Sequence, residues 1–320
     1  MSVALQVGVL GGGIVLLLIS VAAAPLGAWW IANVITNFRL QLAASGLLLL
    51  ILGLLLRMPS AALVAAAVVV VNGLIVLERL RPAAAAVGLP ATGPILRLMS
   101  LNLLYTSRHA ETVFRQVDRI QPDVLLLQEV GTFWAGAVSA LRTSFPHRVE
   151  LPRVGFSPHA HGVPLLSRHP ILEADQQTLG GPSIRLAAAR LAIGDHALWV
   201  ASVHAAKPNG RARLVLQQSQ LEQLAAWVNA RAGPVLLGGD LNATPYAPQL
   251  GRLLAATGMT LDQQVSPAQA FTSTFPAVLP VLGLKLDHIL VRGMTMRQAW
   301  TLPPAGSDHR AVVADVALPD

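Results

Sequence analysis

The longest pattern in the chain is a series of three uncharged, strongly apolar stretches before residue 80. Residues 1–38, 40–56 and 58–77 contain no Asp, Glu, Lys or Arg, and the single arginines Arg39 and Arg57 separate them. A helix of about 20 apolar residues rises about 30 Å, which matches the hydrocarbon core of a bilayer. We therefore expect three transmembrane helices within residues 1–81.

A cleavable signal peptide is the alternative interpretation of the first stretch, with small residues at Ala22, Ala23 and Ala24 near its cleavage site. A signal peptide carries basic residues ahead of its apolar run. Here no Lys or Arg precedes the run, and two more apolar stretches follow it. Trp29 and Trp30 also resemble the aromatic residues found at a membrane boundary. The pattern favours a retained anchor.

Residues 82–94 interrupt the apolar pattern with an alanine-rich segment. The segment contains three prolines and two glycines, residues that do not continue a helix. We expect residues 82–94 to be a linker and residues 95–320 to form a folded domain.

Beyond the linker, short apolar runs alternate with amphipathic segments. Apolar residues recur at helical spacing in residues 113–120 and 214–228, and Gly194 with Asp195 predicts a tight hairpin turn. Strands interleaved with helices, some of them as hairpins, predict a mixed sheet with helices outside it. The runs that predict strands are residues 97–102, 124–127, 184–193, 197–203, 235–237, 286–291 and 311–316.

Composition and charge narrow the possible chemistry. The chain is 53% hydrophobic, and the excess over an ordinary soluble domain lies before residue 80. The formal net charge is +7, but the basic residues of the C-terminal domain are scattered, so nucleic acid is less favoured as a partner. The absence of cysteine excludes disulfides, zinc-thiolate sites and thiol chemistry.

Polar side chains stand at the ends of the predicted strands, where they emerge from a sheet. Singly, each has an ordinary structural role, such as a turn residue, a helix cap or a satisfied buried histidine. Together they offer carboxylates for a hard cation, donors for phosphate oxygens and groups that move a proton from water. The set comprises Asn102, Glu129, His204, Asp240, Asn242, Asp287, Asp308 and His309.

Five short motifs around these residues resemble, in the same order, those of the endonuclease/exonuclease/phosphatase family. They are Leu101-Asn102, Gln128-Glu129, Gly239-Asp240-Leu241-Asn242-Ala243-Thr244-Pro245, Leu286-Asp287-His288-Ile289 and Ser307-Asp308-His309. The likeness covers residues 96–318, and five linked motifs are far more specific than one. The resemblance implies an α/β fold, a four-layer α/β sandwich of two packed mixed sheets flanked by helices, preceded here by three transmembrane helices.

The resemblance also implies which residues bind the metal and the substrate. Glu129 and Asp308 would hold Mg²⁺ or Mn²⁺, with Asn102 nearby. Asn242 and His204 would contact the scissile phosphate, and Asn102 would lie beside it. The expected cofactor is therefore Mg²⁺ or Mn²⁺.

Proton transfer is implied for a second group of residues. Asp240 would position or activate water, and His309, oriented by Asp287, would be the remaining acid, base or charge-stabilising group. Which of Asp240 and His309 deprotonates the nucleophile stays open, because the pKa values of coupled groups belong to the pair.

The arrangement predicts a metal-dependent phosphoesterase with a membrane-linked substrate. Three helices before such a domain resemble the membrane-anchored branch that includes bacterial glycopeptide-resistance proteins, and tethering concentrates the site beside lipid headgroups. We expect a phosphomonoester or phosphodiester of a membrane or envelope molecule, lipid-linked, as the substrate. A membrane-tethered nuclease is the alternative. It is less favoured, because the sequence contains no recognisable insertion that resembles those with which abasic-site endonucleases intercalate into DNA. A catalytically inactive binding module is a second alternative, which the retention of every motif residue disfavours.

Two signals give opposite orientations in the membrane. Arg39, Arg79 and Arg81 lie on the domain side of the predicted helices, against Arg57 on the other side, and the positive-inside rule then favours a cytoplasmic domain. The glycopeptide-resistance branch instead presents the domain outside the cell. We expect a multi-pass protein of the cell (inner) membrane with an extracytoplasmic catalytic domain.

Overall fold

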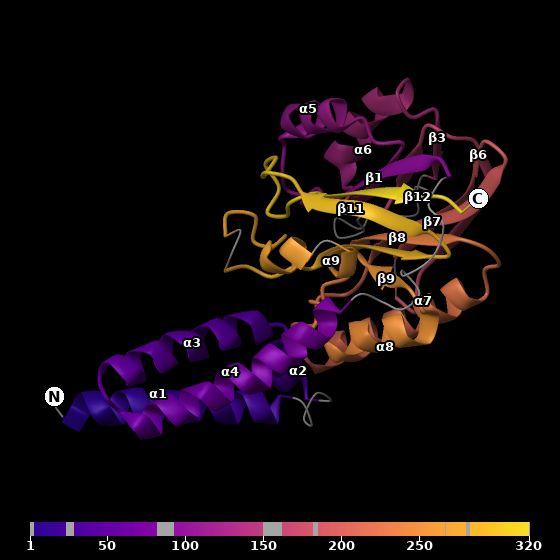
Figure 1. Ribbon diagram of the computed structural model, residues 1–320. Coiled ribbons are helices and arrows are strands. Elements are labelled where there is room, and N and C mark those ends of the chain that lie inside the picture. Colours follow the sequence, from indigo (N-terminus) through magenta and orange to yellow (C-terminus); the bar gives the residue numbers. More distant parts are fainter. Residues whose placement is uncertain are drawn as a thin grey trace.

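An elongated bundle of apolar helices projects from one side of a larger α/β domain in the computed structural model (Figure 1). The bundle contains α1 (Val3–Ala22), α2 (Trp30–Thr36), α3 (Arg39–Leu55) and α4 (Pro59–Leu80). The structure describes residues 3–23, 29–81, 93–149, 162–181, 185–265, 267–279 and 282–319. Most of the predicted linker, residues 82–92, lies outside these ranges.

Only part of the apolar bundle has the length of a bilayer-spanning helix. Among the described residues, α4 is long and apolar enough to cross a membrane, and α2 with α3 is a second candidate if this pair, bent by 68°, counts as one span. The apolar part of α1, Gln6–Ala22, is shorter. The predicted three spans are therefore not shown by helix length, because the uncharged run 1–38 is divided where α1 ends and where the chain bends after Thr36.

A buried polar cluster joins three helices of the bundle. Arg39, only 2% exposed, donates through Nη1 to Ser20 O at 2.7 Å and to Asn72 Oδ1 at 3.0 Å. Asn72 Nδ2 in turn donates to Ser20 Oγ at 2.8 Å. Because a buried charge is costly unless it is hydrogen-bonded, this cluster fixes α1, α3 and α4 relative to one another.

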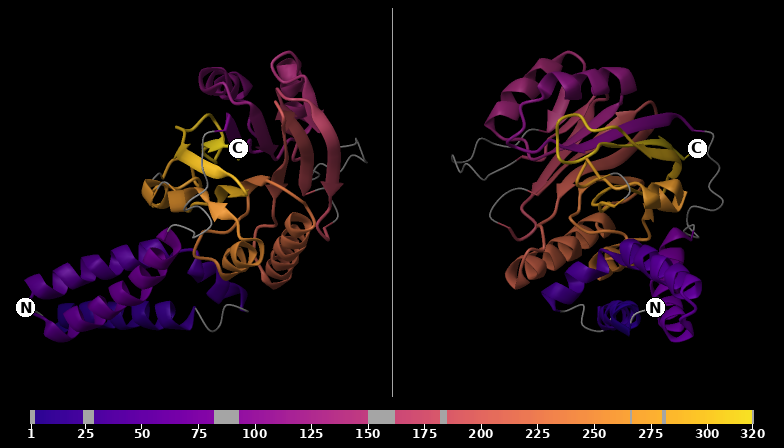
Figure 2. Two further views of the ribbon diagram at one scale, coloured as in Figure 1. Left: turned by 45° about the vertical axis from the view of Figure 1, so that its right-hand side comes forward. Right: turned by 90° about the vertical axis from the view of Figure 1, so that its left-hand side faces the viewer.

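Two six-stranded sheets form the core of the larger domain (Figure 2). The first sheet has the order β11 (Thr295–Thr301), β12 (Val312–Ala317), β1 (Ile95–Asn102), β2 (Val124–Gln128), β4 (Leu165–Ser167) and β3 (His147–Val149). The second has the order β5 (Ile171–Gln177), β6 (Leu186–Ile193), β7 (His196–His204), β8 (Val235–Asp240), β10 (Asp287–Arg292) and β9 (Thr260–Leu261). Both sheets are mixed, since β1–β2 and β7–β8 are parallel and their other pairs are antiparallel.

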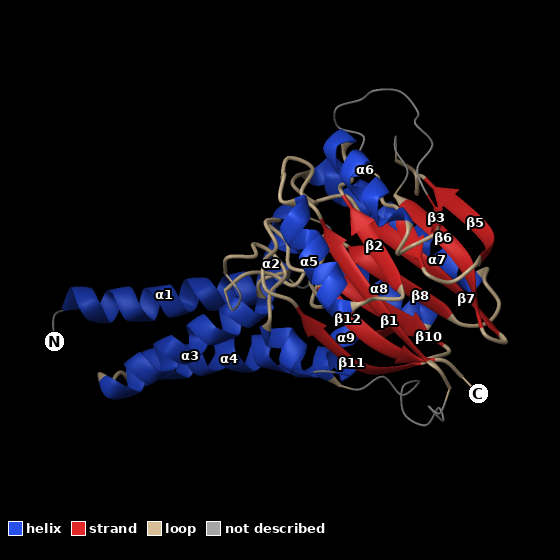
Figure 3. Ribbon diagram, turned by 90° about the horizontal axis from the view of Figure 1, so that it is seen from above, coloured by secondary structure: helices blue, strands red, loops and turns tan. Residues whose placement is uncertain are grey.

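Helices cover the outer face of each sheet (Figure 3). In β1, Leu96 and Leu98 pack toward the second sheet, whereas Met99 and Leu101 pack with the helices of the opposite face. This alternation follows from the two-residue period of a strand. The prediction of two packed mixed sheets flanked by helices is confirmed. The first sheet carries α5 (Ala110–Ile120) and α6 (Thr132–Val138), and the second carries α7 (Arg211–Asn229) and α8 (Pro248–Thr257).

Short elements complete the domain. The predicted hairpin is confirmed, since Ile193 pairs with His196 across a two-residue turn that begins at Gly194 with φ of 58°. The remaining helical turns are 3₁₀ helix η2 (Ser139–Arg142), α9 (Asp262–Val265) and 3₁₀ helix η3 (Pro267–Phe271).

Candidate active site

The predicted site residues converge where the two sheets meet at one edge. In the second sheet, His204 is in register with Asp240, and Asp240 is in register with Asp287. In the first sheet, Asn102 ends β1 and Glu129 directly follows β2. Strand register therefore places His204, Asp240 and Asp287 in one row across the second sheet. Asn102 and Glu129 lie at the corresponding strand ends of the first sheet.

Asn102 links the two sheets at this edge. Its Nδ2 donates to Asp240 Oδ2 and to Glu129 Oε1, both at 3.1 Å. Its Oδ1 accepts the backbone N–H of Leu104 at 3.0 Å, and its backbone oxygen accepts the hydroxyl of Ser307 at 2.6 Å. Asn102 is fully buried. The bonds from Leu104 and Ser307 hold Asn102 in place, and its two bonds to Asp240 and Glu129 then constrain those carboxylates.

The close approach of β8 to β7 requires a glycine immediately before Asp240. Gly239 has φ of +154°, and a Cβ added there would lie 1.9 Å from Val203 O. Only glycine avoids that collision. As a result, Asp240 Oδ2 lies 3.6 Å from His204 Nε2.

His309 and Asp287 form a buried hydrogen-bonded pair. His309 Nδ1 donates to Asp287 Oδ2 at 2.8 Å, and His309 Nε2 faces Asp240 Oδ2 at 3.8 Å. The ring of Phe275 lies against the imidazole with centroids 4.9 Å apart. The carboxylate of Asp287 thereby fixes the orientation of the His309 ring, with Nε2 directed into the site.

The electrostatic environment separates the pKa values of Asp240 and His309. Burial raises the pKa of Asp240 to about 7, opposed by the charge of His309 and assisted by Asp287. Burial opposes protonation of His309, but the carboxylates of Asp287 and Asp240 raise its pKa to about 10. A histidine that is protonated at neutral pH cannot accept a proton, whereas a carboxylate titrating near neutrality can. The arrangement suits Asp240 as base and His309 as acid or charge stabiliser.

Asn242 occupies a loop position next to Asp240. Its backbone N–H donates to Asp240 Oδ1 at 2.8 Å, and its Nδ2 donates to Ala205 O at 3.0 Å. Its φ of 50° is in the left-handed region, which non-glycine residues rarely adopt. The loop therefore depends on its surroundings to hold Asn242 in place.

Glu129 and Asp308 could hold a divalent cation. Asp308 Oδ1 is buried and accepts no hydrogen bond from any described residue. Burial raises the pKa of Asp308, and the nearby carboxylate of Glu129 raises it further. An unsatisfied carboxylate oxygen beside a second carboxylate fits a hard cation such as Mg²⁺ or Mn²⁺.

A second group of potential ligands lies deeper in the site. Ligand atoms of Asp240, Asp287 and His309 lie within 4.8 Å of one another. In this group His309 Nδ1 and Asp287 Oδ2 already satisfy each other in a 2.8 Å hydrogen bond, whereas Asp308 Oδ1 has no hydrogen-bond partner among the described residues. Glu129 and Asp308 are therefore the better candidates.

Arg185 is a site residue that the sequence analysis missed. Its Nη1 lies 3.5 Å from His204 Nδ1. Burial and the charge of Arg213 lower its pKa, whereas Glu129 and Asp240 raise it. A guanidinium in this position can bind a phosphate oxygen. Extending the hairpin register back from Gly194 would have placed Arg185 opposite His204.

Comparisons with known proteins agree with this geometry. The sequence profile of the Endonuclease/Exonuclease/phosphatase family matches residues 99–309. A UPF0294 protein of Yersinia enterocolitica is 25% identical over 254 residues, which cover 75% of this chain and 93% of the relative.

Two solved structures share the fold at low sequence identity. An endonuclease/exonuclease/phosphatase from Beutenbergia cavernae has a TM-score of 0.58 and 20% identity, over 70% of this chain and 72% of that chain. Sphingomyelinase C from Streptomyces griseocarneus has a TM-score of 0.52 and 21% identity, over 69% of this chain and 99% of that chain. The matched profile spans more than half of the chain and contains every predicted site residue, so the chain belongs to the endonuclease/exonuclease/phosphatase family, whose members hydrolyse phosphoesters.

Proposed function

We propose that this chain is a membrane-anchored, Mg²⁺- or Mn²⁺-dependent phosphoesterase that hydrolyses a phosphomonoester or phosphodiester of a lipid or lipid-linked molecule. Family membership supports the reaction class. The lipid substrate rests on one observation, an apolar loop that lies between the candidate site and the anchor helices.

This apolar loop comprises the described residues 271–279 and 282–284. In Figure 1 it is the orange loop near α9 that protrudes on the side from which the helices extend. Val278 is 79% exposed and Leu282 is 71% exposed, which is unusual for neighbouring large apolar side chains. The other exposed apolar side chains of the loop are Phe271 and Leu279.

The apolar loop contacts both the site and the anchor. At the site, the backbone N–H of Ala277 donates to Asp308 O at 2.7 Å. At the anchor, Gln41 near the start of α3 donates through Nε2 to Gly283 O at 2.7 Å. A surface that is apolar, continuous with the anchor and adjacent to the site fits a bilayer interface and a substrate held within it.

In the proposed reaction, water attacks the phosphorus and the bond to the leaving oxygen breaks. Asp240 accepts the proton of the attacking water, and His309 stabilises or protonates the leaving oxygen. Asn242 and His204 bind the non-bridging oxygens. The cation held by Glu129 and Asp308, with Asn102 nearby, would polarise a phosphate oxygen when bound.

The anchor belongs to the same proposal. We propose that α1, α3 and α4 each cross the membrane, with α2 at the domain-side boundary and the catalytic domain on the extracytoplasmic side. The three uncharged runs of the sequence support the number of crossings.

The test uses purified full-length protein in detergent and in lipid vesicles, with Mg²⁺ and Mn²⁺ compared. We expect release of phosphate or headgroup from vesicle lipid, and no comparable nicking of plasmid DNA. Val278→Asp should lower kcat/KM on vesicle lipid by at least ~10-fold, a modest share of what confinement at the membrane supplies. It should leave kcat/KM on a small soluble phosphoester unchanged. Val215→Asp, at an exposed valine on α7 that is not part of the apolar loop, is the matched control. Efficient plasmid nicking without lipid hydrolysis would instead support a nuclease.

A further inference from the structure

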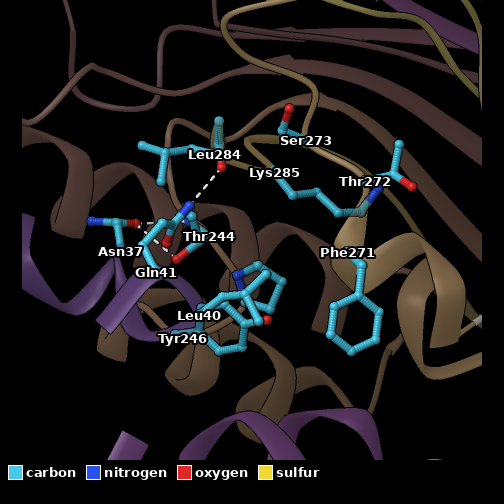
Figure 4. A pocket seen from close by; sticks show the side chains of 12 residues that line it. Asn37, Leu40, Gln41, Thr244, Tyr246, Phe271, Thr272, Ser273, Leu284 and Lys285 are labelled. Carbon is cyan, nitrogen blue, oxygen red and sulfur yellow. Dashed lines mark hydrogen bonds between the residues drawn. The ribbon is translucent and has the colours of Figure 1, made fainter. Parts of the chain in front are cut away.

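The anchor helices reach the catalytic loop through a buried polar contact. Asn37, which directly follows α2, is 5% exposed, and its Oδ1 accepts the backbone N–H of Thr244 at 2.8 Å and the Thr244 hydroxyl at 3.1 Å. Thr244 lies two residues after Asn242. Figure 4 shows the contact at one side of a cleft between the start of α3 and the domain.

The orientation of the Asn37 amide is fixed from within α2. Its Nδ2 donates to Asn33 O at 3.1 Å. The amide oxygen must therefore face Thr244, and no other orientation satisfies both ends of the side chain. Without Asn37, the buried N–H of Thr244 would lose its acceptor.

A second route runs from α2 to the same loop. Asn33 and Gln249 exchange two amide hydrogen bonds of 2.9 and 3.1 Å. Gln249 also donates to Gln217 Oε1 at 2.9 Å. Gln217 then donates through Nε2 to Leu241 O at 3.0 Å and to Asn242 O at 2.7 Å. All three amide side chains are buried.

The remaining carbonyl of the loop is held from inside the domain. His288 Nε2 lies 2.9 Å from Ala243 O, and the opposite ring nitrogen faces Asp262 at 3.6 Å. Residues 241–244 are thus held at every peptide by side chains, and α2 supplies the contact at Thr244 directly. A loop containing a left-handed asparagine needs this degree of constraint.

We propose that Asn37 is a positioning residue for the catalytic loop, and that α2 is part of the active-site scaffold as well as part of the anchor. Asn37 touches no reacting group and acts through Thr244. Asn33 supports the same loop through Gln249 and Gln217. The inference rests on the proposed function, because it assumes that Asp240 and Asn242 act in catalysis.

The kinetic test uses full-length variants in detergent with a small soluble phosphoester. Asn37→Ala should lower kcat by at least ~10-fold and change KM by less than ~2-fold, because displacing a catalytic group by about 1 Å costs up to ~10²-fold. Asn37→Asp should give an intermediate kcat, since it keeps an acceptor for Thr244 but sets a carboxylate oxygen against Asn33 O.

The matched control is Gln264→Ala. Gln264 is also an amide that joins the domain to the anchor, donating to Arg81 O at the end of α4 at 3.2 Å. Its variant should keep kcat within ~2-fold of wild type, because the hydrogen bonds of its side chain go to Arg81 O and to the Leu261 N–H and not to residues 241–244. Equal losses in the Ala variants of Asn37 and Gln264 would show general loosening of the interface and would overturn the proposal.

Hydrogen exchange supplies a readout that does not depend on turnover. Amides of residues 241–247 should exchange faster in Asn37→Ala and at the wild-type rate in Gln264→Ala. Wild-type exchange and kcat in Asn37→Ala would overturn the proposal. If the wild type itself hydrolyses no phosphoester, the proposed function fails, while the exchange experiment still decides whether α2 holds the loop.

Discussion

The Asp287→Asn substitution should remove the charge beside His309 while keeping the ring in place. The amide oxygen of Asn can still accept the Nδ1 hydrogen over the observed 2.8 Å, so the orientation of the imidazole is retained. The negative charge, the largest factor that raises the pKa of His309 toward 10, is lost. Burial favours the neutral ring, and without the charge of Asp287 it lowers the pKa of His309.

The magnitude follows from the pKa. A rise from 6.5 to about 10 represents several kcal/mol, because one pH unit is equivalent to about 1.4 kcal/mol. If Asp287 supplies even a third of that preference, the pKa of His309 in the variant falls by at least ~1 pH unit. A fall of that size still leaves the ring protonated near pH 7, so we expect little change in kcat at neutral pH and a loss of at least ~10-fold at alkaline pH, above the lowered pKa.

The assay is the pH dependence of kcat on a soluble phosphoester, from about pH 6 to about pH 11. A raised pKa favours the protonated ring, so wild-type activity should persist through neutral pH and be lost only as the pH rises through about 10. In Asp287→Asn the alkaline loss should come at lower pH. The control is Asp315→Asn, which breaks the ion pair with Arg97 at the end of β1 away from the site. It should leave the pH of the alkaline loss unchanged. A folded Asp287→Asn variant with the wild-type alkaline limb would refute this reasoning.

Four further predictions concern the metal, the base, the topology and the core. EDTA should abolish activity, Mg²⁺ or Mn²⁺ should restore it and Glu129→Gln should eliminate it, so chelator-resistant hydrolysis would contradict the metal site. Wild-type kcat should rise with pH through about 7, and Asp240→Asn should lose that limb together with at least ~10² in kcat; an unchanged limb would assign the base elsewhere. A reporter fused after Asp320 should be active outside the cytoplasm, and cytoplasm-only activity would reverse the proposed orientation. Trp134→Ala, at a fully buried position beneath the first sheet, should reduce the free energy of unfolding of the domain by ~3 to ~5 kcal/mol in a denaturant titration, and a loss below ~1 kcal/mol would show that the core repacks.

The strands that the apolar pattern did not predict are mostly edge strands. They are β3, β4, β5, β9 and β11, and all except β4 are edges of the two sheets. An edge strand is partly solvated and carries polar residues, as in β5, where Glu173 and Asp175 interrupt the apolar period. Strands inside a sheet contact neighbours on both sides, so the longer ones were visible in the sequence as apolar runs, whereas the interior strand β4 has only three residues.

The residues of the site were easier to predict from the sequence than the contacts of α2 that hold the loop after β8. A polar residue that directly follows a buried apolar run marks the point where a strand leaves its sheet, so the strand ends were visible in the sequence. The docking of α2 depends on tertiary contacts, yet a signal existed. Asn33, Asn37 and Gln41 recur every four residues in an apolar segment, and amides so placed require partners. The bend after Thr36 and the identity of those partners lie beyond any local pattern.

The central position of β1 has a consequence for biosynthesis. Among the described strands of the domain, β1 comes first and β12 last, and they pair over residues 95–100 and 312–317, with Ile95 opposite Ala317. The first sheet therefore cannot close until the final strand has been synthesised, because loop-closure entropy must be offset before such distant contacts form. At ~5 to ~20 residues per second, the nascent domain stays open for many seconds after helices α1 to α4 have been synthesised. The proposed extracytoplasmic orientation requires such an open chain, because a domain passes through a translocation channel before it folds.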